Sequence, residues 1–247
     1  MTSETSNPGG SAGDIFATTH WTVVLAAGRR QTPQADIALG QLCQTYWYPL
    51  YAYVRRRGHS REDAEDLTQA FFARLLGQNF LEHVNSDKGR FRAFLLAALK
   101  HFLANEWDKT RRQKRGGGVP ALSLDWQTAD TKFQVASGME TPDQAFDREW
   151  ALALLTRVIN RLQEDFAAAG KAKWFETLRP VLTVGKSAVS YPEAATTLGI
   201  SEEAVRVAAH RLRKRYRELL RDEIAHTLAD PAQAEEEIRA LFGVFTR

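Results

Sequence analysis

Residues 190–225, SYPEAATTLGISEEAVRVAAHRLRKRYRELLRDEIA, decide much of the fold. Ser190 is a preferred N-cap, a proline follows, and Glu193 stands at the third helical position, so a short helix should begin here. Gly199 permits a left-handed backbone, and Ser201 can cap a second helix. A short helix, a turn containing glycine and a second helix are typical of a helix-turn-helix.

The second helix is strongly basic. Between residues 206 and 221 there are seven Arg or Lys residues and one Glu, a balance of 7 − 1 = +6. Val205 and Leu212 can face the core, while Arg206, His210 and Arg213 share another face. The pattern favours a surface that binds phosphates and base edges of DNA, and the alternative is a solvated face of an ordinary helix.

Three helices are predicted in the first half of the chain. The first starts near Gln34 and ends at Gly58, with Pro49 expected to kink or split it. The second covers residues 60–76, since Ser60 and Asp63 form a capping box. The third starts near Gly89 and ends in the basic run at 109–115, and no segment reads as a convincing strand. The chain is therefore expected to be all-α.

The organisation predicted from these patterns is two small helical domains joined by a flexible linker. Three consecutive glycines and the lack of sustained periodicity make residues 116–140 the linker. A further helix should begin at Thr141, where an N-cap Thr is followed by a proline and then a glutamine at the third position. The expected segments are a disordered leader at 1–14, a domain at 15–115, the linker at 116–140, a helix-turn-helix domain at 141–225, and an acidic, amphipathic C-terminal extension at 226–247. The extension either caps the core or masks the basic helix.

Composition speaks against several classes of protein. The chain has 247 residues, a net charge of +3 and a single cysteine, Cys43, which excludes a disulfide framework and a four-cysteine zinc site. No two histidines stand at metal-binding spacing, and no catalytic motif occurs. We therefore expect no enzyme activity, no cofactor and no metal. The N-terminus lacks the features of a secretory signal and no apolar run spans a bilayer, so a cytoplasmic protein without a membrane partner is expected.

Two segments resemble a known family. Residues 63–72, DAEDLTQAFF, are similar to the core-binding motif in region two of bacterial RNA polymerase sigma factors of the sigma-70 family. Residues 191–213 are similar to the region-four helix-turn-helix of the same family. Both segments in this order resemble the extracytoplasmic-function group, and the resemblance covers about residues 34–225. Ala208 and Ala209 depart from the basic or polar residues that the family often has there.

The resemblance implies three groups of functional residues. The helix at 60–76 would bind the beta-prime subunit of core RNA polymerase through Asp63, Asp66, Leu67, Gln69 and Phe72. The second helix of the helix-turn-helix would bind the −35 promoter element through Glu202, Glu203, Arg206, His210, Arg211, Arg213, Lys214 and Arg215. The end of the third helix would meet the −10 element through Asn105, Trp107, Lys109, Arg111 and Arg112, and Trp107 is equally compatible with a place in the core.

The function that follows is that of a sigma factor, which binds core RNA polymerase and directs promoter recognition and transcription initiation. An anti-sigma or another regulatory protein is a further partner that the resemblance leaves open. The alternatives are a helix-turn-helix transcription regulator with an N-terminal signal or dimerisation domain, and a helical interaction protein with no role on DNA.

Overall fold

The computed structural model describes residues 33–76, 89–110, 124–135, 140–183 and 188–245. These residues form helices, and the only β-type pairing among them is an isolated antiparallel bridge between Arg90 and Leu228. The all-α prediction is confirmed. The leader at 1–14 lies outside the described residues.

The first helices follow the sequence pattern closely. Helix α2 (Pro33–Arg56) ends before Gly58, whose φ is 93°. The Ser60 hydroxyl accepts a hydrogen bond from the Asp63 N–H at 3.0 Å and thereby caps α3 (Arg61–Leu76). The predicted split at Pro49 is wrong, because α2 continues through this residue while the flanking Tyr46 and Leu50 are fully buried. Helix α5 (Phe91–Thr110) completes this group.

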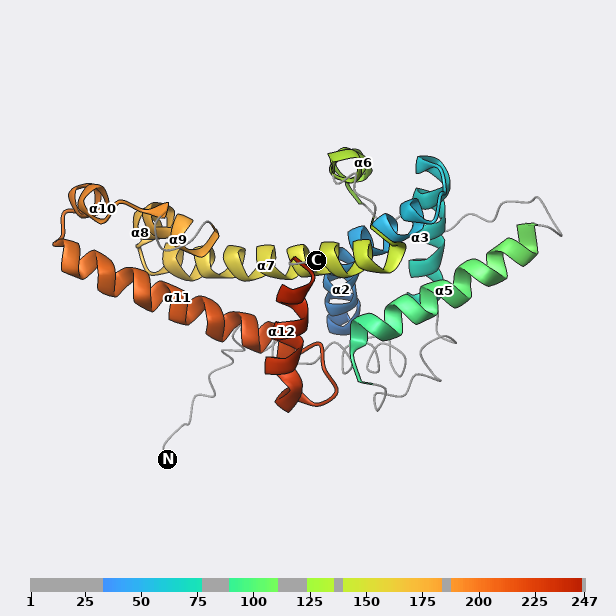
Figure 1. Ribbon diagram of the computed structural model, residues 1–247. Coiled ribbons are helices and arrows are strands. Elements are labelled where there is room, and N and C mark those ends of the chain that lie inside the picture. The colour runs from blue at the N-terminus through green and yellow to red at the C-terminus, as the bar shows by residue number, and fades with distance from the viewer. Residues whose placement is uncertain (1–32, 77–88, 111–123, 136–139, 184–187, 246–247) are drawn as a thin grey trace, which may run out of the picture.

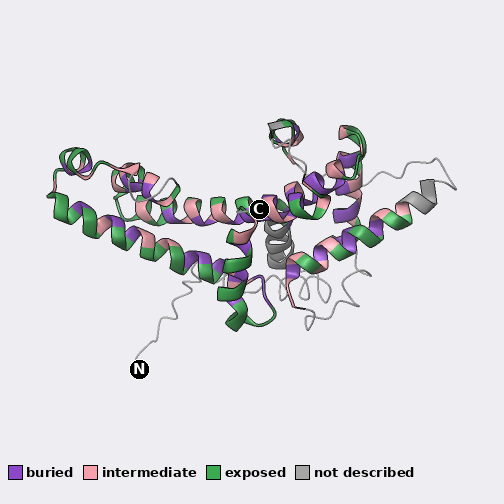
Figure 2. Ribbon diagram, viewed as in Figure 1, coloured by how far each residue is buried: buried purple, intermediate pink, exposed green. Residues whose placement is uncertain are grey.

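Helix α7 (Pro142–Ala168) is the long central element of the molecule (Figure 1). The predicted capping box is present, since Thr141 accepts from the Gln144 N–H and the Gln144 side chain accepts from the Thr141 N–H. Its buried positions recur mainly every three or four residues, so one side is buried along most of its length (Figure 2). This side packs against α2 toward its start and against α11 further on.

One apolar core therefore runs through both halves of the chain, from Cys43 on α2 to Leu241 near the C-terminus. The predicted division into two domains is not confirmed by this packing and stays a prediction.

Part of the linker predicted at 116–140 is helical, and the prediction of a flexible linker is not confirmed. Residues Trp126–Val135 form helix α6. The Trp126 ring lies 5.2 Å from that of Trp47, and the Arg55 guanidinium pairs with Asp130 at 2.7 Å. The hydrophobic periodicity of the sequence did not predict this helix, because the helix has only ten residues and contacts α2 through a narrow face.

The second half contains the predicted helix-turn-helix. Helices α8 (Ala172–Leu178) and α9 (Pro180–Thr183) lead to α10 (Tyr191–Leu198) and α11 (Glu202–Ala225). After α11 the chain turns through the 3-10 helix η4 (Pro231–Gln233) into α12 (Ala234–Gly243). Ala234, Glu237 and Leu241 of α12 are buried, so the extension packs on the core.

Candidate nucleic-acid and polymerase interfaces

The turn between α10 and α11 has the geometry that the sequence predicts. Gly199 adopts a left-handed conformation with φ 67° and ψ 36°. The Ser201 hydroxyl accepts a hydrogen bond from the Ala204 N–H at 3.2 Å and caps α11. Ser190 stands at the N-cap of α10, but its side chain makes no capping hydrogen bond. Buried Ala194 and Ala195 allow α10 to approach α11 closely.

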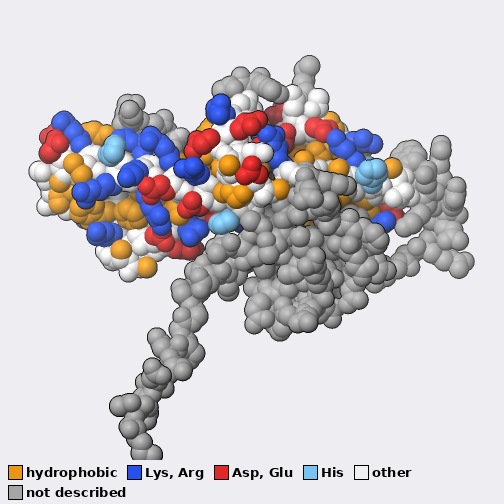
Figure 3. All heavy atoms as spheres, turned by 90° about the horizontal axis from the view of Figure 1, so that it is seen from below, with side chains coloured by type: hydrophobic (Ala, Val, Ile, Leu, Met, Phe, Trp, Pro, Cys, Tyr) orange, Lys and Arg blue, Asp and Glu red, His pale blue; other side chains and the backbone are white. Residues whose placement is uncertain are grey.

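Helix α11 buries one side and presents cations on the other. Val205 and Leu212 are buried, as predicted, and so is Ala209 between them. The arginines and lysines gather over α11 in the view from below (Figure 3). The predicted residues that are exposed here are Glu202, Glu203, Arg206, His210, Arg211, Lys214 and Arg215.

Two residues of this helix differ from the prediction. Arg213 is only half-buried rather than exposed, and its Nη1 is buried without a hydrogen-bond partner among the described residues. Arg217 was counted in the basic balance but not assigned to the site, yet it is exposed. It lies four residues after Arg213, so it extends the face formed by Arg206 and His210 by a helical turn.

The ion pairs of this surface are long and exposed. Arg206 lies 3.9 Å from Glu202 and 3.6 Å from Glu203, and Lys214 lies 3.9 Å from Glu218. Exposed pairs of this kind contribute at most about 1 kcal/mol, because water and salt screen them. An anionic partner such as DNA therefore meets little competition for these cations from their own neighbours.

Helix α3 carries the residues assigned to the polymerase. Asp66 is exposed, while Leu67 and Gln69 are half-buried. The Asp63 carboxylate accepts a hydrogen bond from the Ser60 hydroxyl at 2.9 Å, so it also serves the cap of the helix. Phe72 has no exposed surface, because its side chain packs in the core, so the structure does not present it as a surface contact and its role at the polymerase stays a prediction.

The residues assigned to the −10 element lie at the end of α5 and beyond it. Asn105 is exposed. Trp107 and Lys109 belong to the last turns of α5, but their side chains lie outside the described part of the structure. Arg111 and Arg112 follow the helix and also lie outside it.

The described ranges contain neither a cluster of metal-ligating side chains nor a membrane-spanning helix. No group of three or more His, Cys, Asp or Glu side chains there is arranged to hold a metal ion. None of the helices in those ranges combines the length and the apolar character that a membrane crossing requires.

Comparison with protein families shows that residues 43–113 match the family described as sigma-70 region 2. The matched residues include all of α3 and α5 and the second part of α2, whereas α11 lies beyond them. Comparison with curated proteins and with solved structures gives no match.

Proposed function

We propose that this chain is a sigma factor of the extracytoplasmic-function group, because residues 43–113 match region 2 of the sigma-70 family. It binds core RNA polymerase and directs it to promoters. It performs no catalysis of its own.

One observation carries the proposal: a sigma-70 region 2 and a capped helix-turn-helix with an exposed basic face occur in the same chain. In helix-turn-helix proteins, the first residues of the second helix reach base edges, while cations further along hold phosphates. Arg206 and His210 would then contact bases of the −35 element. Phosphates would be held by Arg211, Lys214, Arg215 and the additional Arg217.

The polymerase contact is assigned to α3. Exposed Asp66 and half-buried Gln69 present acidic and polar groups on a well-capped helix, which supports binding to a basic surface of the beta-prime subunit. The −10 element is assigned to the end of α5. One aromatic residue and several basic residues follow each other in the sequence there. Sites that bind single-stranded DNA combine aromatic rings, which stack on unpaired bases, with cations, which bind the phosphates.

Transcription in vitro tests this proposal. The purified protein should co-purify with core RNA polymerase and should start transcripts at a defined set of sites in a pool of genomic promoters. Core polymerase alone is the control. Specific DNA binding without any polymerase binding would contradict the proposal and favour a helix-turn-helix regulator. If the protein binds neither core RNA polymerase nor DNA, the remaining alternative is a helical interaction protein.

A further inference from the structure

An apolar side chain is exposed on the outer surface of the helix-turn-helix. Val207 of α11 is 41% exposed, whereas Val205, two residues earlier, and Ala209, two residues later, are fully buried. Each residue turns an α-helix by about 100°, so Val207 lies about 200° around the helix from these two buried residues. It therefore points directly away from the core and stands on the outermost ridge of α11.

The neighbours of Val207 on the helix surface give it no apolar partner of its own size. A helical residue lies beside those three and four positions away, which here are Glu203, Ala204, His210 and Arg211. All four are exposed, and three of them are polar or charged. Packing against the protein therefore does not account for a valine at this position.

The side chain of Arg206 leaves the ridge to Val207. Its guanidinium lies 3.9 Å from Glu202 and 3.6 Å from Glu203, and 5.9 Å from the centre of the Tyr191 ring. Both glutamates belong to the first turn of α11, and Tyr191 begins α10. Arg206 thus leans toward the start of the helix and toward α10, while the methyl groups of Val207 stand outermost in this turn.

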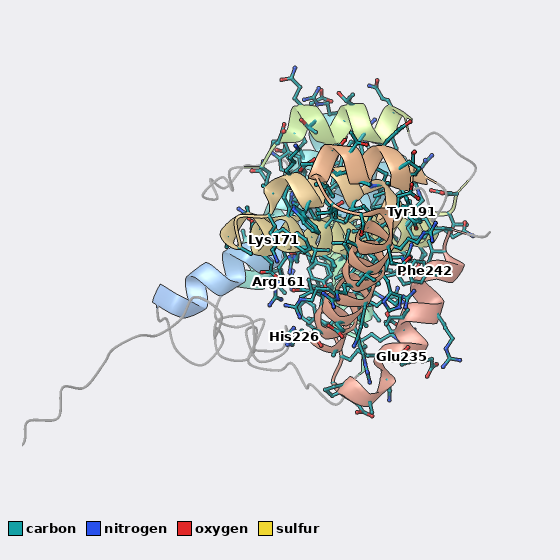
Figure 4. The ribbon with its side chains drawn as sticks, turned by 90° about the vertical axis from the view of Figure 1, so that its left-hand side faces the viewer. Arg161, Lys171, Tyr191, His226, Glu235 and Phe242 are labelled. Carbon is teal, nitrogen blue, oxygen red and sulfur yellow. The ribbon has the colours of Figure 1, made fainter. Side chains whose placement is uncertain are left out.

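The C-terminal extension leaves this ridge uncovered. Within the described residues, the ion pairs of α12 reach Arg90, Arg92 and Arg221, none of which lies in the first half of α11. Figure 4 looks along the molecule from its α10 end and shows Tyr191 well above Glu235 of α12. Masking of the basic helix by the extension is therefore limited to its last turns, where Arg221 lies 3.5 Å from Glu235.

The major groove of DNA offers a matching apolar group. The edges of the bases present hydrogen-bond donors and acceptors there, and thymine adds the methyl group on its C5 atom. The side chain of Val207 has neither a donor nor an acceptor, so apolar contact is the interaction that it can make with a base edge. When the ridge of α11 enters the groove, the cations on either side can bind phosphates and base acceptors while the valine meets a methyl group.

We propose that Val207 recognises a thymine of the −35 element by apolar contact with its C5-methyl group. The inference rests on the proposed function, in which α11 enters the major groove of that element. It adds to the contact surface a residue that forms no hydrogen bond and still distinguishes one base from the others. Uracil differs from thymine only by lacking this methyl group, so the contact can be removed from the DNA without another change.

Duplexes in which single thymines are replaced by uracil test the proposal. The full-length protein, bound to core RNA polymerase, first selects its preferred −35 sequence from a randomised library. Each thymine of that sequence, on either strand, is then replaced in turn. At the contacted thymine, the replacement should lower the affinity of the wild type roughly fourfold, the effect of losing one buried methyl group. In Val207→Ala the same replacement should change the affinity by less than roughly twofold.

Leu152→Ala is the matched control. Leu152 on α7 is 40% exposed, close to the value for Val207, but it lies outside the helix-turn-helix. This variant should keep the wild-type sensitivity to uracil. Val207→Ala should also keep the wild-type dependence of affinity on salt, because valine contacts no phosphate. Alanine is a good helix former, and both positions are exposed on helices, so both variants should fold, which far-ultraviolet circular dichroism verifies.

A second measurement adds the methyl group instead of removing it. The base 5-methylcytosine carries a methyl group at the same ring position as thymine. When the contacted thymine–adenine pair is replaced by cytosine–guanine, methylation of that cytosine should raise the affinity of the wild type and leave that of Val207→Ala unchanged. An effect of the same size in both proteins would contradict the proposal.

The contact and the proposed function fail in different ways, because the same duplexes are also titrated with the free protein. Sensitivity to uracil without any binding to core polymerase would exclude the sigma function and retain the contact. Promoter-specific transcription in which no thymine is sensitive, or in which Val207→Ala keeps the sensitivity, would retain the sigma function and overturn the contact. If neither the free protein nor its mixture with core polymerase binds any duplex, both proposals are wrong.

Discussion

Gly199 sets the direction in which α11 leaves α10. Its φ of 67° lies in the region that side chains with a Cβ avoid, and a Cβ placed there would meet no atom within 4 Å. The requirement for glycine at this position is therefore conformational and not a matter of space.

Gly199→Ala should lower the free energy of unfolding by about 1–2 kcal/mol, the cost of a left-handed conformation for an L-residue. Gly40→Ala is the control. Gly40 lies within α2, also with open space around it, and there alanine should raise the free energy of unfolding by about 0.5–1 kcal/mol. Urea denaturation of both variants measures the difference. Equal changes of the same sign would contradict this account of the turn.

The buried carboxyl group of Glu149 should make the free energy of unfolding depend on pH. Burial raises its pKa from the usual 4.5, and Arg148 only partly offsets this. Between 4.5 and the raised pKa, the folded state holds more protons than the unfolded state, so the free energy of unfolding falls as pH rises through that window. Glu149→Gln removes this contribution. The stability of the variant relative to the wild type should therefore increase from pH 4.5 to pH 7 in urea denaturation.

The exposed Glu164 on the same helix provides the control for that experiment. Glu164→Gln removes a carboxylate from a position where the burial described for Glu149 is absent. If the two variants show the same pH dependence relative to the wild type, burial of Glu149 is not the cause.

At the scale of the element, α11 should contain two kinds of DNA contact. Arg206→Ala should relax the preference at one position of the −35 element, at a cost of about 1–3 kcal/mol, because arginine can bond both acceptors of a guanine. Lys214→Ala should weaken binding to all sequences alike and reduce the salt slope by about one unit. Selection from a randomised −35 library and salt titrations separate the two. If the Arg206→Ala variant ranks the −35 sequences as the wild type does, another residue of the helix contacts the bases.

Helix α3 allows a similar test of the polymerase contact. Asp66→Lys inverts an exposed charge and should weaken binding to core RNA polymerase by several kcal/mol, since like charges would face each other. Glu164→Lys, an exposed inversion on α7, is the control and should leave the affinity unchanged. Affinity is measured by fluorescence titration, with far-ultraviolet circular dichroism to verify the helix content. Wild-type affinity in a folded Asp66→Lys protein would exclude α3 as the contact.

Elements defined by local signals could be predicted from the sequence. The capping box at Thr141 and the glycine turn at Gly199 each depend on a few neighbouring residues, and both are confirmed. Helix α6 was missed because its stability comes from α2, through contacts such as Arg55 with Asp130, which no local pattern reveals. The burial of Phe72 could not be predicted for a related reason. Adjacent Phe71 and Phe72 are both buried, because neighbouring helices cover a wider arc of α3 than one apolar stripe.

Long-range charge pairing was the least predictable feature. The consecutive residues Glu235, Glu236 and Glu237 look alike in the sequence, yet only Glu237 is buried. Its partner Arg92 lies 145 residues away, so the pair depends on the fold as a whole. The acidic character of the extension could be predicted, but not which glutamate enters the core.

At the scale of the whole molecule, the continuous core should make unfolding a single cooperative event. Three tryptophans report on different parts of that core, with Trp47 on α2, Trp126 on α6 and Trp150 on α7. Unfolding in urea should give coincident transitions by tryptophan fluorescence and by far-ultraviolet circular dichroism. Two separate transitions would contradict the single core and favour two independent domains.

The pairing of the chain around Thr227 with the start of α5 also affects how the protein is made. The ribosome synthesises α2, α3 and α5 first, and nascent chains generally begin to fold from the N-terminus. Phe91, Arg90 and Arg92 nevertheless lack their partners Thr227 and Glu237 until the chain has been synthesised through α11 and α12. The growing chain therefore cannot complete this part of its core before α12 is made, and a product truncated before α12 would lack the contacts that close the fold there.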